Sequence, residues 1–114
     1  MFRDLGDREA QAEVLNNLGD LLSRSGDGQQ ARDHHARALT LGREISAPLE
    51  EARALEGIGH CLLRDGDPDA AAAHWQQALA IYERIGATDA RRIQETLRQY
   101  GITTAPAPVG GDKR

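Results

Sequence analysis

Histidine and cysteine are the side chains of this sequence that could do chemistry, because they bind transition metals and cysteine can act as a nucleophile. The chain has His34, His35, His60, Cys61 and His74. Adjacent residues on a helix project about 100° apart, so His34 and His35 point in different directions. His74 stands forty residues after His34, a whole repeat away. The spacing therefore predicts no metal site and assigns the histidines to packing or to the surface.

Other catalytic patterns are equally weak. Cys61 aligns with Leu21 in the internal repeat, which favours a half-buried small hydrophobic residue over a nucleophile. Gly57 and Gly59 fall in the middle of an expected helix with no preceding strand, unlike a phosphate-binding loop. We therefore expect no enzyme activity and no cofactor.

The histidines and Cys61 lie within an internal sequence repeat. Residues 18–27 match residues 58–67 after a shift of forty positions, and the match continues without insertion from residues 31–45 to residues 71–85. A fixed period of this size is typical of helical arrays. Apolar residues recur at steps of three, four and seven within each copy, which places them on one face of a helix.

Each copy is predicted to be a pair of antiparallel helices. Gly26 and Gly66 predict helix ends with positive φ, and Asp27 and Asp67 predict N-caps of the helices that follow. Because so few residues join the two helices, the helices should lie side by side.

The repeat resembles the tetratricopeptide repeat family from about Ala12 to Ile85. The family's small residues of the first helix match Gly19 and Gly59, and those of the second helix match Ala31, Ala38, Ala71 and Ala78. The sequence departs from the family in having His35 at a position that is usually aromatic, and in a period longer than 34 residues. The resemblance implies an all-α solenoid of antiparallel helix pairs.

The start of the chain aligns with the end of a repeat. Residues 1–6 match residues 81–86, and we interpret them as the remnant of a preceding repeat's second helix. The first repeat then covers residues 7–46 and the second covers residues 47–87.

The end of the chain closes the array. Residues 88–101 carry one apolar stripe on a polar helix, which consists of Ile93, Leu97 and Tyr100. This pattern predicts a C-terminal capping helix with a polar outer face. Residues 102–114 alternate proline with small residues and are expected to be a disordered tail.

Composition limits the compartment and the partners. The formal net charge of −4 argues against nucleic-acid binding by this segment. A single cysteine excludes an internal disulfide, and no apolar stretch is long enough for a membrane span or a signal sequence. We expect a cytoplasmic protein. Thirteen of the fourteen basic residues are arginine, a bias that indicates a GC-rich bacterial genome.

The resemblance also implies a groove that binds a protein or peptide partner. In this family the first helix of each repeat lines the concave face. The match predicts nine groove positions, which are Glu13, Asn16, Asn17, Asp20, Arg24, Arg53, Glu56, His60 and Arg64. Asn17 is expected to bind the main chain of an extended peptide. Asp20 and Glu56 argue against capture of a C-terminal carboxylate.

The function implied by the resemblance is a non-catalytic protein-interaction module. The long repeat and the Arg-rich final helix are similar to the C-terminal sensor arrays of actinobacterial multidomain transcriptional regulators and signalling ATPases. Two alternatives stay open. The chain could be a stand-alone adaptor or a non-catalytic subunit of an enzyme complex.

Self-association is a further expectation. Two repeats are fewer than such arrays generally need, so an apolar strip that includes some of Ala12, Leu15 and Leu22 should be uncovered. We predict a homodimer through this N-terminal face, with Phe2, Leu5 and Leu15 at the contact.

Overall fold

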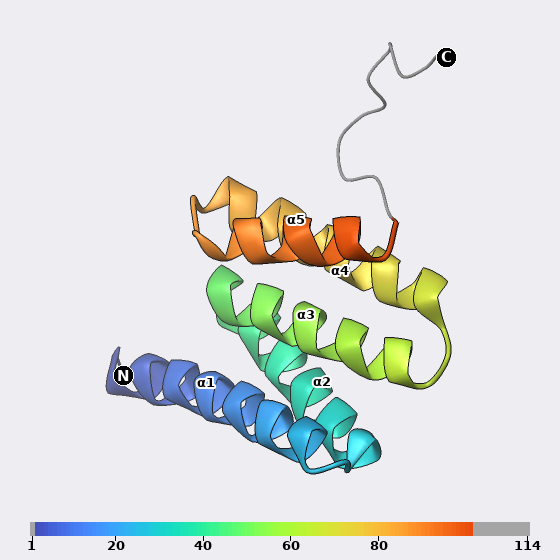
Figure 1. Cartoon of the computed structure of the whole chain (residues 1–114). Coiled ribbons are helices and arrows are strands. Elements are labelled where there is room, and N and C mark those ends of the chain that lie inside the picture. The colour runs from blue at the N-terminus through green and yellow to red at the C-terminus, as the bar shows by residue number, and fades with distance from the viewer. Residues whose placement is uncertain (1, 102–114) are drawn as a thin grey trace.

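The computed structural model describes the backbone of residues 2–101 and the side chains of residues 6–101. This part of the chain forms five helices, which are α1 (Phe2–Arg24), α2 (Gly28–Glu44), α3 (Pro48–Arg64), α4 (Pro68–Arg84) and α5 (Asp89–Gln99). Helices α1 and α2 form one hairpin, α3 and α4 form the next, and α5 packs on α4 (Figure 1). The predicted all-α solenoid with a capping helix is confirmed. The predicted tail at residues 102–114 lies outside the described residues.

Short turns that contain glycine connect the helices of each pair. Gly26 has a φ of 92° and Gly66 a φ of 87°, in the left-handed region that glycine adopts without steric cost. The carboxylates of Asp27 and Asp67 each accept a hydrogen bond of 3.2 Å from a backbone N–H of the following helix. The predicted helix ends and the predicted N-caps are therefore both confirmed.

Helix α1 is longer than the repeat alignment predicts. Gly6 aligns with Gly86, which has a φ of 71° and follows the end of α4. In the structure α1 is continuous from Phe2 to Arg24, so Gly6 lies inside a helix and the expected helix end is absent. The reason is that glycine permits the left-handed conformation but does not impose it. At Gly86 the chain turns into the next helix, whereas no such turn occurs at Gly6.

Rings from the second helix of each repeat pack against glycines of the first. The His35 ring is only 1% exposed and lies between Gly19 of α1 and Gly57 of α3. A Cβ atom would lie 2.6 Å from this ring at Gly19 and 2.4 Å from it at Gly57. Trp75, the equivalent of His35, approaches Gly59 in the same way, at 2.4 Å. The small residues at Gly19 and Gly59 therefore make room for a ring from the second helix.

The hydrophobic core cluster joins the second repeat to the cap. It contains Trp75 and Tyr82 of α4 and Ile93 and Leu97 of α5, and all four have no exposed surface. Tyr100, the third residue of the predicted stripe, is half exposed, and its ring centroid lies 5.7 Å from that of Trp75. The cap helix therefore completes the core of the second repeat.

The first repeat leaves a different strip uncovered from the one expected. Ala12 is fully buried, and Leu15 and Leu22 are partly buried. The exposed apolar residues of α1 are Val14, Leu18 and Leu21. Ala12 lies on the same helix face as Asn16 and Gly19, which are also buried, and this face packs against the other helices. The strip of Val14, Leu18 and Leu21 lies away from it.

A pair of glycine substitutions tests this packing. Gly57→Ala should lower the free energy of unfolding by about 1 to 3 kcal/mol, because the buried His35 ring has no room to retreat from a new methyl group. Gly6→Ala should raise stability by about 0.5 to 1 kcal/mol, because Gly6 is helical and no atom lies within 4 Å of its new Cβ. Thermal or urea unfolding followed by circular dichroism measures both. Equal effects of the two substitutions would contradict the proposed ring packing.

Candidate functional site

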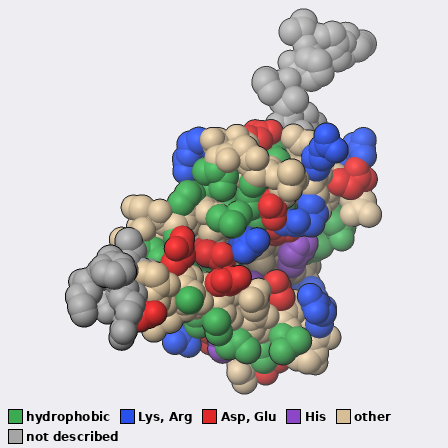
Figure 2. Space-filling model, turned by 90° about the vertical axis from the view of Figure 1, so that its left-hand side faces the viewer, with side chains coloured by type: hydrophobic (Ala, Val, Ile, Leu, Met, Phe, Trp, Pro, Cys, Tyr) green, Lys and Arg blue, Asp and Glu red, His purple; other side chains and the backbone are tan. Residues whose placement is uncertain are grey.

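A groove of about 590 Å³ lies between α1, α3 and α5. Acidic, basic and histidine side chains gather on this face of the molecule (Figure 2). The groove is lined by Glu13, Asn16, Asn17, Asp20, Ser23, Arg24, His35, Arg53, Glu56, Gly57, His60, Asp89 and Arg92. Eight of the nine predicted positions are among these residues.

Arg64 is the predicted position that does not line the groove. Its guanidinium donates hydrogen bonds to the backbone oxygen and the hydroxyl of Ser23, near the end of α1. A cation is favourable there because the last carbonyls of a helix carry partial negative charge. Arg64 therefore fastens the end of α3 to the end of α1.

Asn16 forms the centre of a buried polar network in the first repeat. Its Nδ2 atom donates to the backbone oxygen and to Oε1 of Glu50, each at 3.0 Å. Its Oδ1 atom then accepts from Nδ1 of His35 at 2.9 Å. The two oxygens of Glu50 can only accept, so the NH₂ group of Asn16 must face Glu50 and its oxygen must face His35. Since that oxygen also can only accept, Nδ1 of His35 carries the proton. The other ring nitrogen, Nε2, lies 3.4 Å from Oδ1 of Asp20 at the groove.

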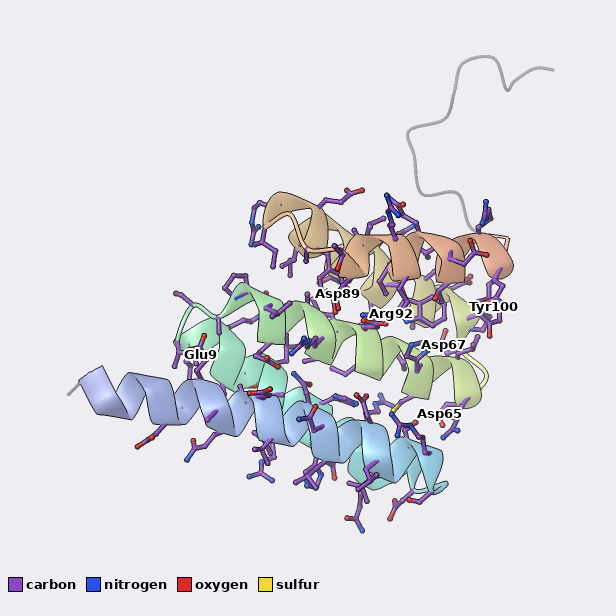
Figure 3. All side chains as sticks on the ribbon, turned by 60° about the vertical axis from the view of Figure 1, so that its left-hand side comes forward. Glu9, Asp65, Asp67, Asp89, Arg92 and Tyr100 are labelled. Carbon is purple, nitrogen blue, oxygen red and sulfur yellow. The ribbon has the colours of Figure 1, made fainter. Side chains whose placement is uncertain are left out.

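Glu56 forms the corresponding network in the second repeat. Its carboxylate accepts two hydrogen bonds of 2.8 Å from Arg92 and one of 2.9 Å from the hydroxyl of Tyr82. Arg92 also donates to Asp89 at 2.9 Å. Figure 3 shows Asp89 and Arg92 extending from α5 on the side that faces α3. The paired, two-point contact of a guanidinium with a carboxylate is strong and directional.

The electrostatics of this network keep both partners charged. Burial raises the pKa of Glu56, but the hydrogen bonds from Arg92 and Tyr82, together with the His60 ring 3.8 Å away, outweigh burial and lower the pKa from 4.5 to about 2. The hydrogen bond to Glu56 raises the pKa of Arg92, and burial raises the pKa of Tyr82. None of these three groups therefore exchanges a proton near neutral pH. The network holds the structure together and is not an acid–base pair for catalysis.

Asn16 and Glu56 occupy the same position of the repeat, forty residues apart. Asn16 links α1 to Glu50 of α3, and Glu56 links α3 to Arg92 of α5. One repeat position therefore joins each groove helix to the next. The sequence placed both residues in the groove as candidate binding residues, and the structure shows that their polar atoms already have partners within the fold.

Other predicted positions remain available to a ligand. The side chains of Glu13, Asn17 and Arg24 are exposed, and they make no hydrogen bond or ion pair with any side chain or backbone group that the structure describes. His60 is half exposed, with its ring centroid 5.2 Å from that of Trp75. Arg53, by contrast, donates to Glu50 at 3.0 Å.

Asp89 and Arg92 are groove residues that sequence reasoning missed. In the sequence, Arg92 stands out only as part of the Arg-rich final helix. The available signal was Glu56 itself, because a carboxylate at a repeat position that faces other helices needs a cation from a neighbouring element. The repeat geometry places that element at the start of α5.

The remaining histidines and the cysteine lie apart from the groove. Nδ1 of His34 lies 2.8 Å from the backbone oxygen of Gln30, and Nδ1 of His74 lies 2.9 Å from that of Ala70. Cys61 is buried, and burial raises the pKa of its thiol. Among residues 6–101, no three His, Cys, Asp or Glu side chains are grouped so that they could hold a metal ion.

Within the described part of the chain, no helix combines the length and the apolar character that crossing a bilayer requires.

The repeated hairpins, the ring-on-glycine packing and the groove lined by the first helix of each repeat define a helical-repeat protein. The sequence model of the tetratricopeptide repeat matches residues 10–84, and the chain belongs to this family. No curated protein and no solved structure shows a significant match.

The Glu56 network predicts a specific loss of stability in acid. Since folding lowers the pKa of Glu56 from 4.5 to about 2, its contribution is fully present above pH 4.5 and is lost as the pH falls through about 2. The shift corresponds to about 3 kcal/mol at most. Urea unfolding from pH 7 to pH 2 should show Glu56→Gln less stable than the native chain at pH 7, with the difference narrowing in acid.

Glu95→Gln is the matched control. Glu95 is exposed and pairs only with Arg98 on its own helix, within the described residues. This variant should follow the native chain at every pH. A constant difference between Glu56→Gln and the native chain down to pH 2 would contradict the assigned network.

Proposed function

We propose that the chain is a non-catalytic protein-interaction module that binds an extended peptide segment of a partner protein in the groove. Membership of the tetratricopeptide family supports a role in protein interaction. The observation that carries the proposal is the row of exposed polar side chains on the α1 wall, Glu13, Asn17 and Arg24, whose polar atoms have no partner among the described residues.

The opposite walls support the proposal because they are rigid. Glu56 and Arg92 are held to each other by two hydrogen bonds, and Arg53 is held by Glu50. A ligand therefore does not have to order these side chains when it binds. Such preorganisation lowers the entropic cost of binding.

The spacing of the α1 row indicates the chemistry of the peptide. Glu13 lies eleven residues before Arg24 on the groove side of the same helix, which corresponds to about 16 Å at 1.5 Å per residue. An extended peptide covers this length in about five residues. We infer a ligand with a basic residue near Glu13 and an acidic residue near Arg24. Asn17 lies between them, and its amide can both donate to and accept from the peptide main chain.

We further propose that the array is the sensor part of a bacterial transcriptional regulator and acts in the cytoplasm. The support is the forty-residue repeat and the Arg-rich α5, two features similar to the arrays of such regulators. A stand-alone adaptor or a non-catalytic subunit of an enzyme complex is the alternative. The gene sequence upstream distinguishes them, because a winged-helix or P-loop region would support the regulator and its absence would favour the alternatives.

Peptide selection tests the binding site. Peptides selected from a displayed random library on the native chain should bind Asn17→Ala/Arg24→Ala at least about tenfold more weakly, as expected when a charge-assisted and a main-chain hydrogen bond are both lost. Fluorescence polarisation measures the affinity. Helicity and melting temperature should be unchanged, because both residues are on the surface.

Gln77→Ala/Arg84→Ala is the matched control, since it removes an amide and a guanidinium from exposed positions of α4 outside the groove. It should bind like the native chain. Selected peptides that bind all three proteins equally would contradict the proposed groove.

A further inference from the structure

The apolar strip of α1 lies on the outer side of the array. Val14 is 53% exposed, Leu18 is 40% exposed and Leu21 is 59% exposed. They follow one another at steps of four and three residues, which aligns them along one side of the helix. Large apolar side chains gathered in this way usually mark a contact surface.

The internal repeat shows what kind of surface this strip is. The equivalent residues of α3 are Ala54, Ile58 and Cys61, and all three are buried. Helix α3 follows the α1–α2 hairpin in the chain, and α2 packs closely against it (Figure 1). In the described residues no helix precedes α1 in this way. By analogy with α3, the strip on α1 is therefore a surface on which another helix can pack.

A hollow beside the strip provides a complementary feature. It has a volume of about 450 Å³, lies between α1 and α2, and is lined by Asp7, Ala10, Gln11, Val14, Leu15 and Arg37. It flanks the first half of the strip, whereas Leu21 projects from the second half. One molecule therefore carries both a projecting leucine and a hollow, about ten residues apart along one helix.

We propose that a second copy of this chain covers the strip, with the two α1 helices antiparallel and related by a two-fold axis near Val14 and Leu18. In this arrangement Leu21 of each copy lies over the hollow of the other. Such a self-complementary contact is what a two-fold interface requires.

The far end of the array favours this arrangement over a head-to-tail one. A second copy could cover the strip with its α4 only if that helix had a free face. The face of α4 beyond the second repeat is already packed against α5, whose Ile93 and Leu97 are fully buried. A closed dimer through α1 is therefore the form that a second copy can adopt without unfolding the cap.

The interface inferred here differs from the predicted one in its residues. The side chains of Phe2 and Leu5 lie outside the described residues, and Leu15 is partly buried and lines the hollow. The groove residues are not part of the strip, so groove variants leave the dimer intact and loss of the dimer leaves the peptide site in place.

Sedimentation velocity of residues 1–114 from 1 to 100 µM tests the proposal. The native chain should be a dimer, and Val14→Glu/Leu21→Glu should be monomeric, with a dissociation constant raised by more than about 30-fold, as for loss of interface hot spots. Ala80→Glu, at an exposed position of α4, should remain dimeric. A monomeric native chain would overturn the proposal, and so would a dimer that survives Val14→Glu/Leu21→Glu.

Disulfide formation tests the orientation. When Asp7→Cys and Ser25→Cys chains are mixed and oxidised, antiparallel packing brings the two different cysteines together, so the mixed disulfide should predominate. Cys61 is buried and should not compete. A predominance of disulfides between identical chains would overturn the antiparallel arrangement.

Discussion

A buried charge that needs a partner governs the arrangement of the groove. The Glu56 carboxylate lies between α3, α4 and α5. Leaving it there without a cation would lower the free energy of unfolding by about 3 to 5 kcal/mol. Arg92 neutralises it with two hydrogen bonds, and Asp89 holds Arg92 in turn. The position of α5 on the second repeat therefore depends on this ion pair as well as on the burial of Ile93 and Leu97. Because α5 carries the groove residues Asp89 and Arg92, the Glu56–Arg92 ion pair also fixes the wall of the groove that α5 forms.

The two repeats meet the same requirement with different side chains. In the first repeat, the side chain of Asn16 pairs with the His35 ring. In the second repeat, the Glu56 carboxylate pairs with Arg92. Trp75 occupies the position equivalent to His35 and donates to the backbone oxygen of Glu56. In both, the ring packs on a glycine of the first helix. This variation keeps a ring against a glycine in both repeats, but it gives the groove the Asn16–His35 hydrogen bond at one end and the Glu56–Arg92 ion pair at the other.

Local features and the fold class could be predicted from the sequence because each has a short-range cause. The Gly26 and Gly66 turns and the Asp27 and Asp67 caps depend on residues a few positions apart. The roles of the groove residues could not be predicted in this way. Helical periodicity treats Asn16 and Glu56 as polar and therefore exposed, but their environment is set by Glu50 and Arg92 on other helices. The continuity of α1 through Gly6 also depends on context beyond the local sequence.

Asn16 and Asn17 are adjacent in sequence, but Asn16 holds the groove together through its hydrogen bonds to Glu50 and His35, whereas we propose that Asn17 binds a peptide. Nuclear magnetic resonance can follow the side-chain amide of each residue during titration with a selected peptide. The account predicts that the Asn17 amide signals shift with saturation, together with backbone signals near Glu13 and Arg24. The Asn16 amide should stay unchanged and exchange slowly with solvent. Shifts confined to α2 and α4, or a shift of Asn16 without one of Asn17, would contradict the account.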